Sequence, residues 1–124
     1  MNPYDRELYT RTIALKKQNP SLRVFLAVGG WAMSGPPFSN MARAEATRAV
    51  FIESVMNTLE TYGFDGIDLD WEYPTAPDRG GDPADTANYV TLVRELRQAF
   101  GSDLKISVAI PASFCKFINI LPLP

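Results

Sequence analysis

Apolar residues recur at helical spacing in separate segments of this chain, and this pattern predicts a helix over residues 2–18, 43–62 and 83–100. Asn2 can cap the first helix and Pro3 suits its first turn, and Pro83 can likewise open the third helix. Gly63 and Gly101 are expected to end the second and third helices. The apolar stripes consist of Val50, Phe51, Ser54-Val55, Leu59 and Tyr62 in the second helix and of Tyr89, Val93, Leu96 and Phe100 in the third.

Shorter apolar runs between these helices predict strands over residues 22–28, 64–74 and 104–110. The first run is rich in branched residues, as expected of a strand that is covered on both faces, and Gly29-Gly30 closes it. Helices and strands therefore alternate with a repeat of roughly 40 residues, which is typical of right-handed parallel crossovers. The chain is predicted to be an α/β protein.

Two architectures share this alternation, an open doubly wound sheet and a (β/α) barrel. The sequence contains no glycine-rich phosphate loop of the dinucleotide or P-loop type, which weakens the open-sheet interpretation. Acidic residues at the carboxyl end of a strand favour the barrel, where catalytic groups lie on that rim.

The middle strand carries Asp68, Asp70 and Glu72 at every second position, so these carboxylates are expected to share one face. The opposite face would carry Ile67, Leu69 and Trp71. Neighbouring acids would lie roughly 6–7 Å apart, close enough for their charges to couple, and Glu72 at the end should hold its proton more tightly. A proton donor that works near neutral pH could form here.

The amino-acid composition further limits which partners and which kinds of catalysis the chain could have. The chain has 124 residues, 46% of them apolar, which is enough for the core of one domain. Its formal net charge of −2 comes without a basic cluster, so no nucleic acid partner is expected. Histidine is absent, which excludes Ser-His and Cys-His catalysis and the usual zinc sites. The single cysteine, Cys115, forms no internal disulfide framework, and carboxylates must carry any chemistry.

The start of the chain is polar, so it does not resemble a secretory signal. No apolar run approaches the length that spans a membrane, and no membrane partner is expected.

The segment Asp65–Glu72 resembles the DxxDxDxE signature of family 18 glycoside hydrolases, the chitinases, and it matches at all four acids. Residues 26–31 are similar to the SxGG strand of that family, with Ala27 where serine is usual, so one polar contact of the family is expected to be lost. The segments that most resemble fungal chitinases of the killer-toxin-like subgroup are residues 64–74, 76–81 and 88–92.

This resemblance implies a (β/α)8 TIM barrel, of which the chain would hold about strands 3 to 5 with their helices. Residues 1–114 would form a partial catalytic domain, since a complete barrel needs about 250 residues. Residues 115–124 depart from the family and form a divergent tail, which we interpret as an artefact of the gene model. Members of the family are commonly extracellular, so an extracellular location is expected.

The resemblance also implies retaining, substrate-assisted cleavage of β-1,4-linked N-acetylglucosamine, with chitin or chitooligosaccharides as the substrate. Glu72 would be the general acid and base, and Asp70 would orient the acetamido group of the sugar. Asp68 would pair with Asp70 and tune its proton, whereas Asp65 would have a structural role. No cofactor and no metal are implied.

Candidate substrate-binding residues are Tyr73, Trp31, Gly29 and Gly30. Tyr73 could instead pack at the rim, and Trp31 could stack a sugar or pack on its loop. The two glycines could admit the substrate or simply make a turn.

Other functions remain open at this point. The chain could be a lectin-like chitin-binding protein, although the presence of Glu72 favours the enzyme. The three acids could bind Mg²⁺ through their oxygens. The isolated chain could also be an inactive remnant, because three parallel strands leave two unpaired edges.

Overall fold

The computed structural model describes residues 4–111. Its helices are α1 (Asp5–Ala14), α2 (Pro36–Ala42), α3 (Glu45–Tyr62) and α4 (Asp85–Phe100). Its strands are β1 (Phe25–Gly29), β2 (Gly66–Asp70) and β3 (Lys105–Val108). Short 3-10 helices are η1 (Leu15–Lys17), η2 (Trp31–Met33) and η3 (Pro77–Arg79). The start of the first predicted helix and the tail 115–124 lie outside the described residues.

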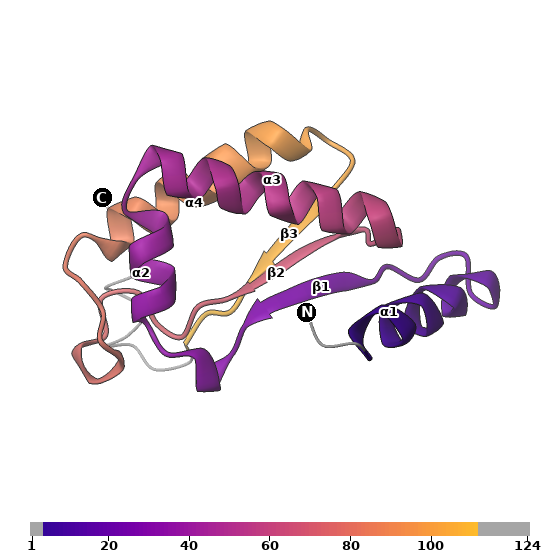
Figure 1. Ribbon diagram of the computed structural model, residues 1–124, viewed down its shortest axis with the longest axis horizontal. Coiled ribbons are helices and arrows are strands. Elements are labelled where there is room, and N and C mark those ends of the chain that lie inside the picture. Colours follow the sequence, from indigo (N-terminus) through magenta and orange to yellow (C-terminus); the bar gives the residue numbers. More distant parts are fainter. Residues whose placement is uncertain (1–3, 112–124) are drawn as a thin grey trace.

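The strands form one parallel sheet in the order β1-β2-β3 (Figure 1). Ala27 of β1 and Ser107 of β3 both pair with Asp68 in the register of the sheet, and Gly29 pairs with Asp70. Helices α2 and α3 connect the first two strands, and α4 connects the next two. The predicted α/β class with parallel strands is therefore confirmed.

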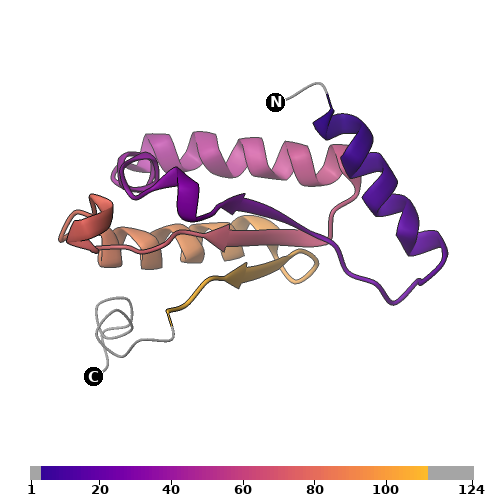
Figure 2. The same cartoon turned by 90° about the horizontal axis from the view of Figure 1, so that it is seen from below.

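Helices α3 and α4 cover one face of the sheet, and Figure 2 shows the opposite face. Ile67 and Leu69 of β2, and Trp71 just after the strand, are fully buried beneath these helices. They pack in one core with buried side chains of the two helices, including Leu59, Leu92 and Leu96. Burial of a large apolar side chain contributes about 1.5–3 kcal/mol, so this layer holds the central strand in place.

The predicted helix stripes are largely correct. Leu59, Tyr89, Leu96 and Phe100 are buried in the core. Val50 was wrongly included, because its side chain is 68% exposed on the outer side of α3. Among the remaining predicted stripe residues, Val55 is buried in the core, and Phe51, Tyr62 and Val93 are partly buried against it. Ser54 was also wrongly included, because it is exposed.

The sequence pattern predicted the middle strand over residues 64–74, but β2 covers only Gly66–Asp70. Gly29, the last residue of β1, has a φ of 120°, and a Cβ there would lie 2.3 Å from the carbonyl oxygen of Asp70. The pairing of β1 with β2 ends at Gly29 and Asp70, and Glu72 lies in the loop beyond this last pair.

The pattern also missed α2, η2 and η3, which lie in the loops that follow β1 and β2. Helix α2 has seven residues and begins with two prolines, which suit a first helical turn. Such a helix is too short for a recognisable apolar repeat.

Candidate active site

Three of the four acids of the signature, Asp68, Asp70 and Glu72, lie along β2 and just beyond its carboxyl end. Asp68 and Asp70 belong to the strand, and Glu72 follows it. All three are partly exposed, whereas the residues that alternate with them are buried under α3 and α4. The sheet thus separates an acidic face from an apolar one.

Asp68 is held by a neighbouring strand. The Ser107 hydroxyl of β3 donates a hydrogen bond of 2.5 Å to Asp68 Oδ1. On the other side, β1 places Ala27 opposite the same aspartate, and its methyl group can donate nothing. Asp68 therefore receives a polar contact from Ser107 of β3, although Ala27 of β1 offers none.

Sequence reasoning did not identify Ser107. Its signal was present, because Ser107 is the polar residue between Ile106 and Val108 in a predicted apolar strand. The register between the strands decides whether this serine falls on the face of the acids, and the sequence alone does not give that register.

Asp70 lies between the other two acids. Burial, the negative charges of Glu72 and Asp68, and a hydrogen bond with the Glu72 side chain together raise the pKa of Asp70 above its ordinary value. Two carboxyl groups can hydrogen-bond only when one of them carries a proton. The raised pKa of Asp70 favours its protonated form, which can donate a hydrogen bond to a neighbouring carboxylate.

Tyr73 extends this cluster. Burial, a hydrogen bond with the Glu72 side chain, and the charges of Glu72 and Asp70 raise the pKa of the Tyr73 hydroxyl. The hydroxyl therefore stays protonated and can donate to the Glu72 carboxylate. Tyr73 is thus a neighbour of the acids at the carboxyl end of β2.

Gly29 and Gly30 border Asp70 on the β1 side. The Gly30 amide donates a hydrogen bond of 2.8 Å to the backbone oxygen of Asp70. A Cβ at Gly30 would lie 3.4 Å from Asp70 Oδ2, so this glycine leaves space beside the carboxylate. Both glycines contribute to the geometry of the acidic face.

Trp31 begins η2 and is 58% exposed. The Arg79 guanidinium, which comes from η3, lies 3.9 Å from the centre of its ring. A cation at this distance is attracted to the face of an aromatic ring. One face of Trp31 is thus covered, and much of the ring remains open.

Trp71, on the apolar side, anchors the strand end. Its ring stacks on Phe38 with centroids 5.2 Å apart, and it meets Tyr89 edge-on at 5.3 Å. Burial and the negative charges of Asp68 and Asp70 raise the pKa of Tyr89. The field of the acids therefore reaches through the sheet to its buried side.

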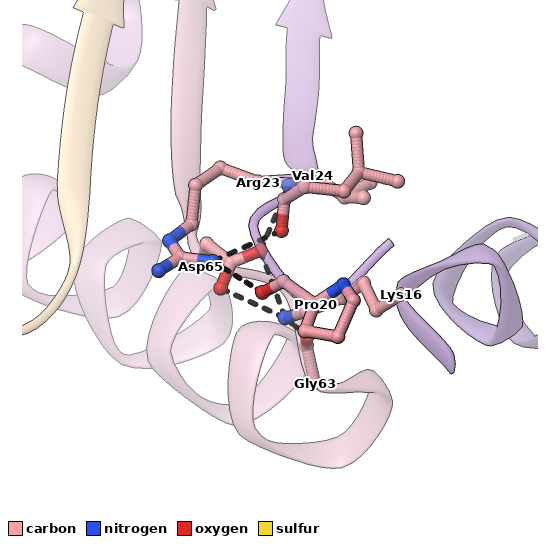
Figure 3. A network of polar contacts seen from close by, with 7 residues as sticks. Lys16, Pro20, Arg23, Val24, Gly63 and Asp65 are labelled. Carbon is pink, nitrogen blue, oxygen red and sulfur yellow. Dashed lines mark hydrogen bonds and ion pairs between the residues drawn. The ribbon is translucent and has the colours of Figure 1, made fainter. Parts of the chain in front are cut away.

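Asp65, the first acid of the signature, lies at the other end of β2 (Figure 3). Lys16 Nζ contacts both carboxylate oxygens at 2.8 and 2.9 Å, and the Val24 amide donates to Oδ2 at 2.8 Å. Burial alone would raise the pKa of Asp65, but these hydrogen bonds and the charges of Lys16 and Arg23 lower it. Asp65 thus connects η1 and the residue just before β1 to the start of β2, at the end of the strand opposite Glu72.

Within residues 4–111, no group of three or more histidine, cysteine or acidic side chains is arranged to hold a metal ion. In the same part of the chain, no helix has the length and apolar character needed to cross a membrane.

The sequence profile of "Glycosyl hydrolases family 18" matches residues 1–122. The chain belongs to glycoside hydrolase family 18. Endochitinase of Manduca sexta is 42% identical to this family 18 chain over 110 residues, which are 86% of this chain and 20% of the relative.

Solved structures of family 18 chitinases agree with this fold. Ostrinia furnacalis Group IV chitinase in complex with allosamidin superposes with a TM-score of 0.87 at 34% identity, over 93% of this chain and 31% of that one. The chitinase domain of the Clostridium difficile spore coat protein CotE gives 0.84 at 36% identity, over 96% and 34%. The predicted barrel fragment is confirmed, and the killer-toxin-like subgroup stays a prediction.

The chain spans about a fifth of the length of the curated relatives and about a third of the solved chains that it matches. The residues described here therefore correspond to one section of the relatives' chains.

Proposed function

We propose that this chain supplies the acid-bearing part of a chitin-cleaving glycoside hydrolase. The observation that carries the proposal is the set of partly exposed carboxylates Asp68, Asp70 and Glu72 along and just after β2, in a chain that the family 18 profile matches. Chitin or chitooligosaccharides are the proposed substrate, and an extracellular location is part of the proposal.

In this mechanism Glu72 protonates the glycosidic oxygen, and the 2-acetamido carbonyl oxygen of the sugar attacks the anomeric carbon. The bond to the leaving sugar breaks as an oxazolinium ion forms. Glu72 then accepts a proton from the attacking water. The configuration at the anomeric carbon is retained because it is inverted twice.

Asp70 orients the acetamido group in this proposal, and its raised pKa supports a proton that moves between Asp70 and Glu72. Asp68, fixed by Ser107, provides the charge that tunes this proton. Trp31 and Tyr73 line the substrate side with Gly29 and Gly30.

Asp65 has a structural role in the same proposal. Its contacts to Lys16 and Val24 support that role, since they lie at the strand end opposite Glu72.

The test is a chimeric domain in which residues 4–111 replace the matching segment of Ostrinia furnacalis Group IV chitinase, called the grafted domain below. Glu72→Gln should lower turnover of a chromogenic chitooligosaccharide at least about 100-fold, because general acid catalysis contributes that much. Binding of the oligosaccharide should stay within a few-fold, and Glu60→Gln on the exposed side of α3 should change neither quantity.

Unchanged turnover in Glu72→Gln would remove Glu72 from the reaction. A folded grafted domain that binds the oligosaccharide without cleaving it would favour a lectin-like function.

A further inference from the structure

Two loops carry the residues around the acid pair, and one side chain joins them. Trp31 lies in the loop after β1, and Glu72 lies in the loop after β2. Arg79, at the end of η3, contacts both. It is partly buried and comes from the same loop as Glu72.

The guanidinium of Arg79 makes three contacts at once. Nε donates a hydrogen bond of 3.1 Å to the backbone oxygen of Glu72, and Nη2 donates to the backbone oxygen of Trp31. The same group lies over the Trp31 ring. A planar guanidinium has donors fixed in several directions, whereas a lysine ammonium is one point charge on a flexible chain.

The backbone of Arg79 reinforces the connection. Its carbonyl oxygen accepts a hydrogen bond of 2.8 Å from the Gly35 amide, in the loop after β1. A Cβ at Gly35 would lie 2.5 Å from that oxygen, so the two loops approach as closely as glycine allows. The position of the Arg79 side chain is therefore fixed against both loops.

We propose that Arg79 is a positioning residue, which sets the Glu72 carboxyl group and the Trp31 ring relative to each other across the two loops. The inference rests on the proposed function, because it assumes that Glu72 donates the proton and that Trp31 faces the sugar. A displacement of about 1 Å at a catalytic group can cost about 100-fold in rate, so a side chain that fixes two such groups matters for turnover.

The first experiment compares Arg79→Lys and Arg79→Ala in the grafted domain. Both should lower kcat by about 10- to 100-fold and should shift the pH profile of kcat, because the coupling between Glu72 and Asp70 depends on their separation. If Arg79 acted only through its charge, Arg79→Lys would retain the parent values. Such retention would overturn the proposal.

Arg97 provides the matched control. Its Nη1 donates hydrogen bonds of 2.9 Å to the backbone oxygens of Gly101 and Leu104, at the opposite end of the sheet. Arg97→Lys loses similar contacts and should lower only stability, with the pH profile unchanged. If Arg79→Lys behaves in the same way, Arg79 is merely structural and the proposal fails.

A second experiment uses the full 124-residue chain and needs no catalysis. Trp31 is exposed and Trp71 is fully buried, so their indole N–H signals can be followed separately by NMR. Arg79→Lys and Arg79→Ala should each move the Trp31 signal and leave that of Trp71 in place. An unchanged Trp31 signal would overturn the proposal. A shifted signal beside an inactive parent graft would leave the Arg79 contact supported and would reject the proposed function instead.

Discussion

At the scale of single residues, the site depends on carboxyl groups with different surroundings. Asp68 accepts from a serine hydroxyl, whereas the negative charges of two neighbouring acids and burial raise the pKa of Asp70. Environments that separate the proton affinities of neighbouring acids are typical of acid–base catalysis. The order of the acids along β2 thus gives each carboxyl group its own neighbours.

Asp70→Asn should stabilise the protein at neutral pH. The folded pKa of Asp70 is raised above 3.8, so the fold favours the neutral form, and the associated stability is lost as pH rises through that folded pKa. Asparagine stays neutral and avoids this loss. The midpoint of urea unfolding should be higher for the variant than for the parent at pH 7, with the difference disappearing near pH 3.

Glu60→Gln on the exposed side of α3 is the control for Asp70→Asn, and it should give no such pH-dependent gain. A lower midpoint for Asp70→Asn at pH 7 would show that Asp70 stabilises the fold.

The sequence pattern was sufficient to place the acids on one face and the apolar residues on the other, because strand geometry alternates side chains. It was not sufficient for Ser107 or Arg79. The Ser107 contact depends on the register between strands about 40 residues apart, and the Arg79 contacts depend on the packing of two loops. Neither is encoded in a local repeat.

At the scale of elements, specific contacts at the ends of the β-strands fix how the strands lie against their neighbours. Asp65 joins the start of β2 to η1 and to the residues just before β1, and Gly29 lets β1 pack closely against Asp70 at the other end. Helices α3 and α4, which link the strands, were predicted from their apolar repeats. Helix α2 is too short to show such a repeat. Each strand end can be tested by one substitution.

Asp65→Ala should destabilise the chain by about 2–3 kcal/mol, because it removes hydrogen bonds that involve charged groups in a partly buried site. The pKa of Asp65 is lowered in the fold, so its contribution is present above 3.8 and is lost as pH falls through the folded value. Urea unfolding of variant and parent should therefore converge at low pH.

The exposed ion pair of Glu7 and Arg11, 3.6 Å apart, is the control for Asp65→Ala. Glu7→Gln should cost less than about 1 kcal/mol. An equal loss in the two variants would contradict a special role of Asp65.

Gly29→Ala should destabilise the chain more than Gly101→Ala does. Both glycines have a positive φ, which costs another residue about 1–3 kcal/mol, but a Cβ at Gly101 would meet nothing within 4 Å. At Gly29 it would overlap the Asp70 carbonyl oxygen and lie 2.8 Å from a Phe38 ring carbon. Equal losses in urea unfolding would show that β1 can move away from Asp70 at little cost.

At the scale of the whole molecule, the structure provides one section of a barrel with its acids at the carboxyl end. The alternation of helices and strands predicted the class, and the acids within the strand favoured the barrel over the open sheet. The remaining walls of a sugar-binding cleft come from other strands in a closed barrel. We therefore expect the acids of this chain to need those strands for turnover.

The most direct measurement compares the 124-residue chain with the grafted domain in the hydrolysis of a chitooligosaccharide, with the first-formed products followed by ¹H NMR. We expect the grafted domain to cleave the substrate and release the β-anomer, and we expect no turnover by the chain alone. Cleavage by the chain alone at the rate of the grafted domain, or release of the α-anomer first, would contradict this expectation.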